Sequence, residues 1–323
     1  DKKLVNVDIH QTEHILYSEA VLFADNDRVK VAIQDQHTNI ILIEKNGEVV
    51  FEKEHDECAD CDPYDIFKQV SSREIFEFSC EVELDKIRFI GQAAALNRAL
   101  SNEGLRENYG LHIGRTLRKQ VGSGLMSDDL LSKIMIETTA ASDARMGGAT
   151  LPAMSNSGSG NQGIAATMPV VVVADYLNVS EEKRLRALFL SHLMAIYIHS
   201  KLPKLSALCA VTTASMGSCA GIAYLLTGKF ETVSMGICSM IGDISGIICD
   251  GASNSCAMKV STSVASGYKS VLMAMDETHV TGNEGIVEHD LDRTIDNLCS
   301  IASKSMHHID RQVIEIMVSK PCP

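Results

Sequence analysis

Small residues dominate two long stretches of the chain, and this restricts the possible fold more than any other feature. Five glycines stand among Ala, Ser and Thr in residues 139–168, and residues 206–267 are again rich in Ala, Ser, Gly, Cys and Met. Small side chains let helices approach closely and let backbone N–H groups reach a ligand. Because a mid-helix glycine costs up to about 1 kcal/mol relative to alanine, we expect these residues where helices crowd together or begin.

The rest of the composition excludes several classes of protein. The chain has 323 residues, no Trp and only 5% aromatic residues, so Ala, Val, Ile, Leu, Met and Gly must fill its core. The net charge of −13 argues against a nucleic-acid partner and against docking on an anionic membrane. The apolar runs fall short of the ~18 residues that a membrane span requires, and no apolar signal stretch follows Asp1. We therefore expect a cytoplasmic protein.

The first part of the chain carries strand patterns. Val29, Val31 and Ile33 alternate with polar neighbours, as expected for a half-buried strand. Residues 40–45 and 48–51 flank Asn46-Gly47, a dipeptide that tolerates the positive φ angles of a tight hairpin turn. A β-hairpin is predicted here.

Helical patterns follow the strands. Residues 84–100 have helical periodicity, and Ser72 is a candidate cap of a shorter helix before them. Polar and acidic residues at 127–129 favour a helix start, and Ser180 with two glutamates predicts a helix that runs to about residue 200. The expected fold is α+β, with a β-rich segment over 1–75 and a helical, small-residue body over 76–323. Because the chain starts without Met, we expect the first segment to be the remainder of an N-terminally truncated α/β domain.

The ten cysteines are the first candidates for chemistry. Without a secretion signal they are not expected to form a disulfide framework, because the cytosol keeps thiols reduced. Cys249 and Cys256 form a C-x6-C pair on a glycine-containing turn, too widely spaced for a structural zinc knuckle. Cys209 would complete a set of three ligands. On spacing alone, packing of these cysteines in the core remains the favoured alternative.

A glycine-rich loop at residues 157–163 is the second candidate. Consecutive N–H groups beside glycines form an anion-binding nest, and a helix that starts near Gln162 would add its dipole. The alternative is a tight loop between helices. The spacing does not match a dinucleotide-binding motif. Nearby, Arg145 could bind a carboxylate in a bidentate manner, or could make a structural contact with Asp143 or with a helix end.

Four long blocks identify the chain as similar to a known family. Residues 141–148, 151–164, 240–246 and 248–256 closely resemble the L-cysteine desulfidase family, also called the serine dehydratase alpha-like or UPF0597 proteins. The resemblance covers essentially the whole chain and is densest over residues 84–320.

The resemblance implies an iron–sulfur lyase. Family members hold a [4Fe–4S] cluster with three cysteines, which map onto Cys209, Cys249 and Cys256, and the open iron acts as a Lewis acid. A C-terminal cysteine caps this iron in related serine dehydratases, which makes Cys322 a candidate fourth ligand. The implied reaction is β-elimination of L-cysteine to pyruvate, ammonia and sulfide. The substrate-binding candidates are Ser157, Ser159, Asn161, Gln162 and Arg145.

Two other functions stay open. L-serine dehydration is the nearest alternative, since an open iron could also assist loss of hydroxide. The other is a non-catalytic amino-acid-binding domain or inactive fragment, because the family's base cysteine lies in a Gly-Cys-Thr-Glu-Pro segment that this sequence lacks. The catalytic base is therefore unassigned. A homo-oligomer is an open possibility, because helices rich in Ala and Gly commonly pack across dimer interfaces.

The remaining titratable residues are weaker candidates. Asp243 and Asp250 flank the predicted ligands and could bind an amino group or be solvated turn carboxylates. His192 and His199 share one helix face at a spacing too long for a shared zinc, and buried structural roles are favoured. The Cys58–Cys61 pair lies in an acidic loop, which raises thiol pKa values, and is interpreted as incidental.

Overall fold

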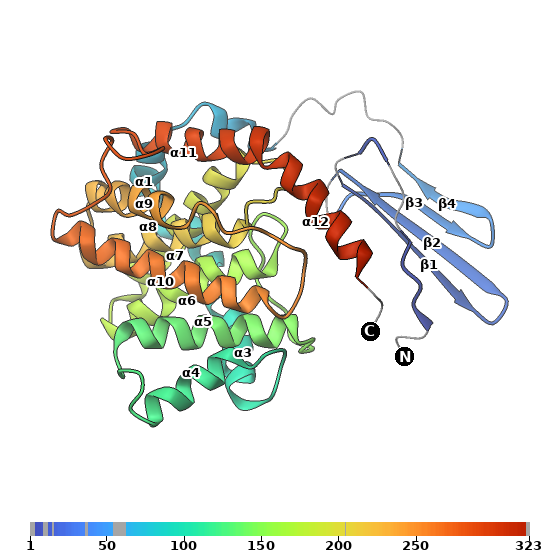
Figure 1. Cartoon of the computed structure of the whole chain (residues 1–323), viewed down its shortest axis with the longest axis horizontal. Helices are drawn as coiled ribbons and strands as arrows, with labels where there is room; N and C mark the ends of the chain where they lie inside the picture. The colour runs from blue at the N-terminus through green and yellow to red at the C-terminus, as the bar shows by residue number, and fades with distance from the viewer. Residues whose placement is uncertain are drawn as a thin grey trace. The chain divides into compact units, whose positions relative to one another are not determined.

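The computed structural model describes residues 4–8, 12–14, 16–35, 38–53, 63–203 and 205–320. The protein is α+β, with a four-stranded sheet followed by a long helical part (Figure 1), as the sequence predicts. Contacts within the chain divide it into a unit of residues 1–63 and a unit of residues 64–323. Residues 64–75, which the sequence analysis placed in the β-rich part, belong to the helical unit.

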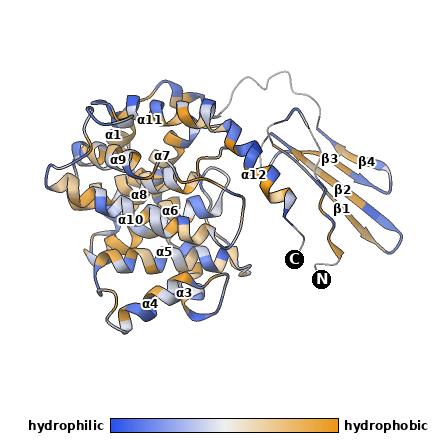
Figure 2. Ribbon diagram, in the orientation of Figure 1, coloured by the Kyte–Doolittle hydropathy of each residue, from blue (hydrophilic) through white to orange (hydrophobic). Residues whose placement is uncertain are grey.

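The sheet is an antiparallel meander. Its strands follow chain order: β1 (Tyr17–Ala24), β2 (Asp27–Gln34), β3 (Ile40–Lys45) and β4 (Glu48–Glu52). Asn46 and Gly47 have φ angles of 53° and 88°, which confirms the predicted hairpin between β3 and β4. Figure 2 shows hydrophobic residues along the bodies of the strands and hydrophilic residues at the hairpin turns.

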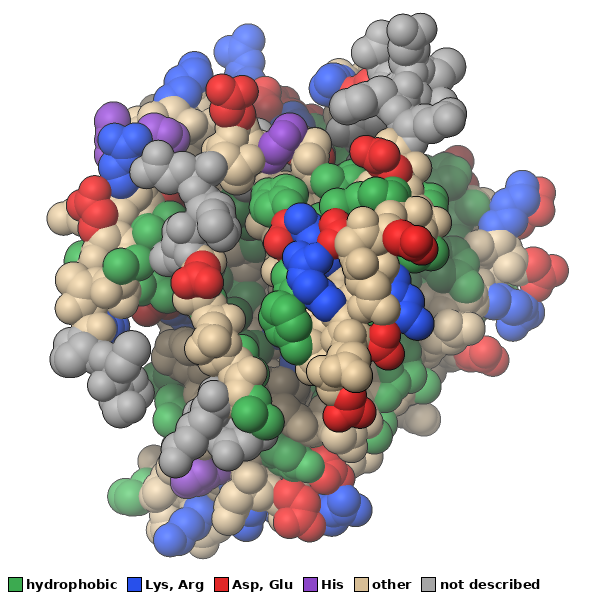
Figure 3. Space-filling model, turned by 90° about the vertical axis from the view of Figure 1, so that its right-hand side faces the viewer, with side chains coloured by type: hydrophobic (Ala, Val, Ile, Leu, Met, Phe, Trp, Pro, Cys, Tyr) green, Lys and Arg blue, Asp and Glu red, His purple; other side chains and the backbone are tan. Residues whose placement is uncertain are grey.

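The two faces of the sheet differ in polarity. Lys30 reaches diagonally across to Glu19 on the same face, with 2.9 Å between Nζ and Oε2, and Arg28 pairs with Glu44 on that face. Leu22 points to the opposite face and is 68% exposed. On the view in Figure 3, acidic and basic side chains lie side by side and are not gathered by sign.

The described residues of the helical unit form α-helices together with three 3₁₀ or π segments. Their bounds are η2 (Pro63–Lys68), α1 (Ser72–Glu81), α2 (Leu84–Ile87), η3 (Arg88–Ile90), α3 (Gly91–Arg106), α4 (Ile113–Gly122), α5 (Leu130–Met146), α6 (Gly160–Tyr176), α7 (Glu181–Ser200), α8 (Ala210–Leu226), α9 (Phe230–Ile244), α10 (Cys256–Met275), α11 (Leu291–Ser300), η4 (Ile301–Ser305) and α12 (His307–Ser319).

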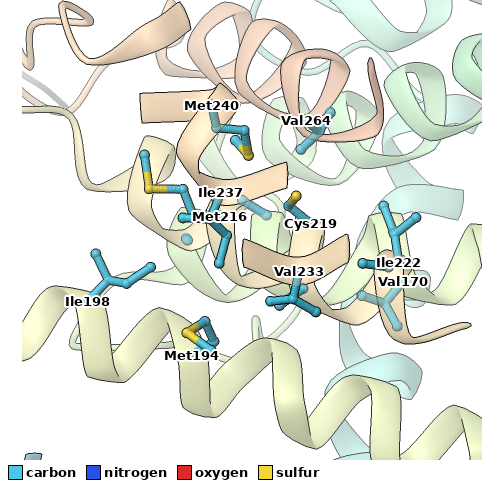
Figure 4. Packing of buried hydrophobic residues seen from close by; sticks show 14 of the residues in the cluster. Val170, Met194, Ile198, Met216, Cys219, Ile222, Val233, Ile237, Met240 and Val264 are labelled. Carbon is cyan, nitrogen blue, oxygen red and sulfur yellow. The ribbon is translucent and has the colours of Figure 1, made fainter. Parts of the chain in front are cut away.

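Helix α8 is the centre of this unit. It contacts α6, α7, α9 and α10, and all but three of its residues are buried. Figure 4 shows Met194 of α7, Met216 and Cys219 of α8 and Ile237 of α9 packed together. A Cβ atom on Gly217 would lie 2.3 Å from a backbone oxygen of α7. The small residues therefore permit the close helix packing that the composition predicts.

Several predicted helix starts are confirmed. The Ser180 side chain accepts a hydrogen bond from the Lys183 N–H at 3.3 Å and caps α7, which ends at Ser200. The side chain of Asp129 caps α5. Ser71 caps α1 with a reciprocal bond to Glu74, so the predicted cap at Ser72 is wrong by one residue.

The helix predicted over residues 84–100 is interrupted. The structure has α2, then the 3₁₀ turn η3, and then α3, which continues to Arg106. Packing on α7 accounts for the break, because the Phe89 ring contacts the Phe189 ring edge-on at 6.4 Å between centroids. No described helix is long and apolar enough to cross a membrane.

Candidate functional site

Cys209 and Cys249 are brought together by a short antiparallel bridge. Leu208 pairs with Ile248, and the Cys249 N–H donates to the Ala207 oxygen at 2.7 Å. The Cys209 N–H donates to the oxygen of the residue preceding Ile248 at 2.9 Å. Residues forty apart in the sequence therefore occupy adjacent backbone segments, and Cys209 lies directly before the first residue of α8.

Cys256 joins this pair from the start of α10. The loop after Cys249 turns at Gly251, whose φ is 94°, and returns the chain to Cys256. The Ser253 N–H donates to the Cys256 sulfur at 3.5 Å, which fixes the thiol inside the loop. The thiols of Cys249 and Cys256 therefore lie near enough to Cys209 to act on it electrostatically.

The electrostatic environment of the thiols is mixed. Burial, with smaller contributions from the neighbouring thiols of Cys249 and Cys256, raises the pKa of Cys209 to about 11. Lys259 opposes this shift because its ammonium group lies near Cys209. Lys259 also forms an ion pair with Asp250. The Cys209 thiol is consequently protonated at neutral pH unless a cation binds it.

The other buried cysteines of this half have structural surroundings. Cys219 and Cys238 lie in the main core, on α8 and α9, and burial raises the pKa of each thiol. Cys209 belongs to the same buried hydrophobic cluster, and Cys249 packs against it, so the core-packing alternative from the sequence stays open. In the described ranges, no three His, Cys, Asp or Glu side chains are arranged around a single metal ion.

The glycine-rich loop forms a tight turn before α6. Asn156 and Ser159 exchange backbone hydrogen bonds of 3.0 and 3.1 Å, while Ser157 and Gly158 adopt φ angles of 48° and 83°. Helix α6 starts at Gly160, slightly earlier than predicted, so its unpaired N–H groups lie next to this turn.

Asn161 and Gln162 are buried in the first turn of α6. The Asn161 side chain accepts a hydrogen bond from the Ser142 hydroxyl at 3.1 Å. Gln162 is only 4% exposed, and its Oε1 has no hydrogen-bond partner among the described residues. A buried acceptor of this kind is unfavourable unless a donor reaches it.

Arg145 connects the loop to the cysteines. A Cβ atom on Gly160 would lie 2.2 Å from the Arg145 Nε, so the guanidinium lies directly against the start of α6. Burial lowers the pKa of Arg145, and the nearby thiol of Cys256 opposes that shift. The cation therefore stands between the predicted anion-binding loop and the thiols.

Asp143 has a different role from the contact with Arg145 that the sequence left open. Its carboxylate accepts a hydrogen bond from the Gly114 N–H at 2.8 Å, at the start of α4. No ion pair joins it to Arg145 in the described part of the chain, where Arg145 instead contacts the Met146 sulfur. Burial raises the pKa of Asp143 to about 6, although the hydrogen bond from the Gly114 N–H opposes this shift.

The two carboxylates that flank the cysteines already have cationic partners. Asp243 accepts hydrogen bonds from Lys269 and Ser266, both at 2.7 Å, and Asp250 pairs with Lys259. Neither is poised to receive an amino group while these pairs persist. The cysteines at positions 58, 61 and 322 lie outside the described residues.

Two features escaped the sequence analysis. Lys259 could have been identified from its position one helical turn after Cys256, since residues three apart share a helix face. Asn254 lies near Gly110, because a Cβ there would be 3.1 Å from the Asn254 Oδ1. That contact between distant segments has no signal in the sequence.

A cavity of about 610 Å³ lies between α1, α9 and α11. Its lining includes Arg73, Glu231 and His289. None of the predicted site residues lines it, so the candidate site is distinct from this cavity.

The fold defines the class as an α+β protein, and in its helical unit the half-buried Arg145 lies against the start of α6 and near Cys256. Comparison with known proteins gives the family. The model of the serine dehydratase alpha chain family matches residues 30–315. A UPF0597 protein of Actinobacillus pleuropneumoniae serotype 3 is 71% identical over 320 residues, covering 98% of this chain and 73% of the relative.

Further relatives show the same coverage. A UPF0597 protein of Dichelobacter nodosus is 62% identical over 317 residues, covering 98% of this chain and 73% of its own length. The UPF0597 protein YhaM of Escherichia coli is 58% identical over 310 residues, with 95% and 71% coverage. The chain belongs to the serine dehydratase alpha-like UPF0597 family, and this membership is consistent with a lyase.

Proposed function

We propose that this protein is an iron–sulfur lyase that eliminates sulfide from L-cysteine, giving pyruvate and ammonia. The observation that carries the proposal is the meeting of Cys209, Cys249 and Cys256 beside Arg145 and the loop before α6. A thiol-rich centre and an anion-binding turn are two of the parts that such a reaction requires; the base that removes the α-proton of the substrate is unassigned.

The three thiols suit a [4Fe–4S] cluster by their chemistry. Three thiolates are the donor set of a cluster with one open iron. Cys209 and Cys256 stand at the starts of α8 and α10, where helix dipoles favour negative charge. Lys259 and Arg145 add positive charge. The bound cluster would supply a Lewis acid that polarises a substrate group.

The protein's own residues would bind the carboxylate of the substrate. Arg145 offers a guanidinium that can form two parallel hydrogen bonds to a carboxylate. The N–H groups around Ser157 and Ser159 and the start of α6 offer further donors. The unpartnered Oε1 of Gln162 is an acceptor in the first turn of the same helix.

Cluster content and turnover measured together test the proposal. Anaerobically prepared full-length protein is expected to contain about four irons and four sulfides per chain and to release sulfide from L-cysteine. Cys256→Ser is expected to lose most of the iron, whereas Cys80→Ser, a half-buried cysteine on α1, is expected to retain it. Equal iron content in the two variants, or none in the wild type, would overturn the cluster assignment.

L-Serine dehydration is the second candidate, and the description of the matching family favours it. Both reactions release pyruvate, but only elimination from cysteine releases sulfide. Parallel assays with the two amino acids therefore separate them. Exclusive turnover of L-serine would replace the substrate while leaving the cluster assignment intact.

A further inference from the structure

A buried histidine that the proposed reaction does not use lies behind the glycine-rich loop. His192 of α7 is 6% exposed, and its ring has hydrogen-bond partners on both nitrogens. Nδ1 lies 3.1 Å from the Asn156 Nδ2, and Nε2 lies 2.9 Å from the Thr167 Oγ1. The side chain thus connects α7 both to the loop and to α6.

Both the nitrogen and the oxygen of the Asn156 side-chain amide make hydrogen bonds in this connection. Its Nδ2 donates one proton to the His192 Nδ1 and the other to the His192 backbone oxygen, both at 3.1 Å. Its Oδ1 accepts a hydrogen bond from the Ser157 hydroxyl at 2.9 Å. Asn156 is 3% exposed. The side chain has one orientation that satisfies these donors and acceptors.

The partners also determine the tautomer of His192. Nδ1 must accept because it faces an amide donor, so Nε2 carries the proton and donates to Thr167. Thr167 in turn donates to the Gly163 oxygen at 2.6 Å and accepts from Asn97 at 3.1 Å. The Asn97 oxygen accepts from the Met154 N–H at 3.0 Å. Both ends of the loop are therefore tied to one continuous network.

Alternative arrangements of the loop are restricted by close packing. A Cβ atom on Gly163 would lie 1.8 Å from the Met154 oxygen, so the chain before the loop lies directly against α6. The loop cannot shift toward α6, and the network holds it from the side of α7. Its backbone N–H groups keep the direction that the tight turn gives them.

We propose that His192 is a positioning residue that, through Asn156, holds the turn at residues 156–159 in the conformation that receives the substrate carboxylate. The carboxylate role rests on the proposed function. His192 itself acts on the turn and does not touch the reacting atoms.

Two substitutions of His192 distinguish the hydrogen bond made by Nδ1 from the hydrogen bond made by Nε2. In His192→Asn, the side-chain oxygen can take the place of Nδ1 and accept from Asn156, while the contact with Thr167 is lost. In His192→Gln, the amide nitrogen can take the place of Nε2 and donate to Thr167, while Asn156 loses its acceptor. Both remove a ring from the core, so a general loss of stability affects them alike.

Hydrogen exchange followed by mass spectrometry tests the proposal on the full chain without substrate. Exchange in a peptide covering residues 154–163 is expected to be about tenfold faster in His192→Gln and within about threefold of wild type in His192→Asn. Ser191→Ala removes the adjacent buried hydroxyl, which bonds to α6 but not to the loop, and is expected to leave this exchange unchanged. Equal exchange in the Gln and Asn variants would overturn the proposal.

Kinetics give an independent readout. The KM for the amino-acid substrate is expected to rise about tenfold in His192→Gln, with a smaller change in kcat, and to stay near wild type in His192→Asn. If His192→Gln does not fold, Asn156→Ala breaks the same contact from the loop side. A wild-type protein without turnover would refute the proposed function, whereas unchanged exchange in Asn156→Ala would refute the role of His192.

Discussion

Among single side chains, Lys259 has the largest expected influence on the thiols. Its ammonium group lowers the pKa of Cys209, and it also interacts with Cys249. Although burial opposes its charge, the hydrogen bond to Asp250 and the neighbouring negative groups keep the pKa of Lys259 above its usual value. A permanently charged lysine at this position favours the thiolate forms.

Replacing this lysine is expected to weaken metal loading. Lys259→Gln should lower the affinity of the thiols for iron about tenfold, because a nearby cation that favours the deprotonated form of Cys209 is lost. Iron content after anaerobic reconstitution measures the effect. Lys269→Gln, which loses a pair with Asp243, is the matched control and should keep wild-type iron. Equal loss in both variants would contradict the assignment.

Asp143 is expected to make stability depend on pH. Its folded pKa of about 6 lies above the usual value of 3.8, so between these values the folded state binds more protons than the unfolded state. The contribution of Asp143 to stability therefore increases as pH falls from about 6 to 4.

The variant Asp143→Asn tests this sign. The free energy of unfolding of the variant minus that of wild type should be larger at pH 7.5 than at pH 4.5. The reason is that the amide avoids the cost of a buried charge only where the wild-type carboxyl is ionised. Urea unfolding at the two pH values measures the difference. A difference that is independent of pH would show that burial does not raise this pKa.

At the scale of elements, glycines determine how closely helices pack. Gly217 brings α8 against α7, where a Cβ would lie 2.3 Å from the Ser191 oxygen. Gly122, the last residue of α4, has nothing within 4 Å of such an atom. The same substitution therefore has opposite expected effects at the two positions.

Thermal or urea unfolding of the two alanine variants measures this contrast. Gly217→Ala should destabilise the protein by about 2 kcal/mol, because overpacking forces the helices apart. Gly122→Ala should stabilise it by about 0.5 kcal/mol, because alanine loses less backbone entropy on folding. Similar effects of both substitutions would contradict the packing argument.

The elements differ in how far the sequence predicts them. Local signals sufficed for the hairpin at Asn46-Gly47 and for α7, because a turn dipeptide or a capping side chain acts on its own neighbours. The break at residues 88–90 has no such signal, since it arises from packing against Phe189. Likewise, spacing selected the three cysteines, but their approach depends on the pairing of Leu208 with Ile248, which is a tertiary contact.

At the scale of the whole molecule, the sheet unit carries its own risk of association. Leu22 and Phe23 of β1 are 68% and 72% exposed, and Val50 of β4 is 65% exposed. Both strands are edges of the sheet, and exposed apolar edge strands are templates for aggregation.

A polar residue with high strand propensity should reduce this risk. Leu22→Thr is expected to keep the sheet folded and to raise the protein concentration at which light scattering detects aggregates by about twofold or more. Ile134→Val, a conservative change in the core of the helical unit, is the control and should not change this concentration. Unchanged aggregation of Leu22→Thr would show that β1 does not mediate association.

The order of the thiols along the chain has a consequence for biosynthesis. Cys209 and Cys249 come together only when the bridge between their segments forms, and Cys256 follows at the start of α10. A nascent polypeptide cannot offer all three sulfurs at once until Cys256, the first residue of α10, has left the ribosome. The proposed cluster would therefore be inserted only after this point, when the helices that surround α8 have assembled.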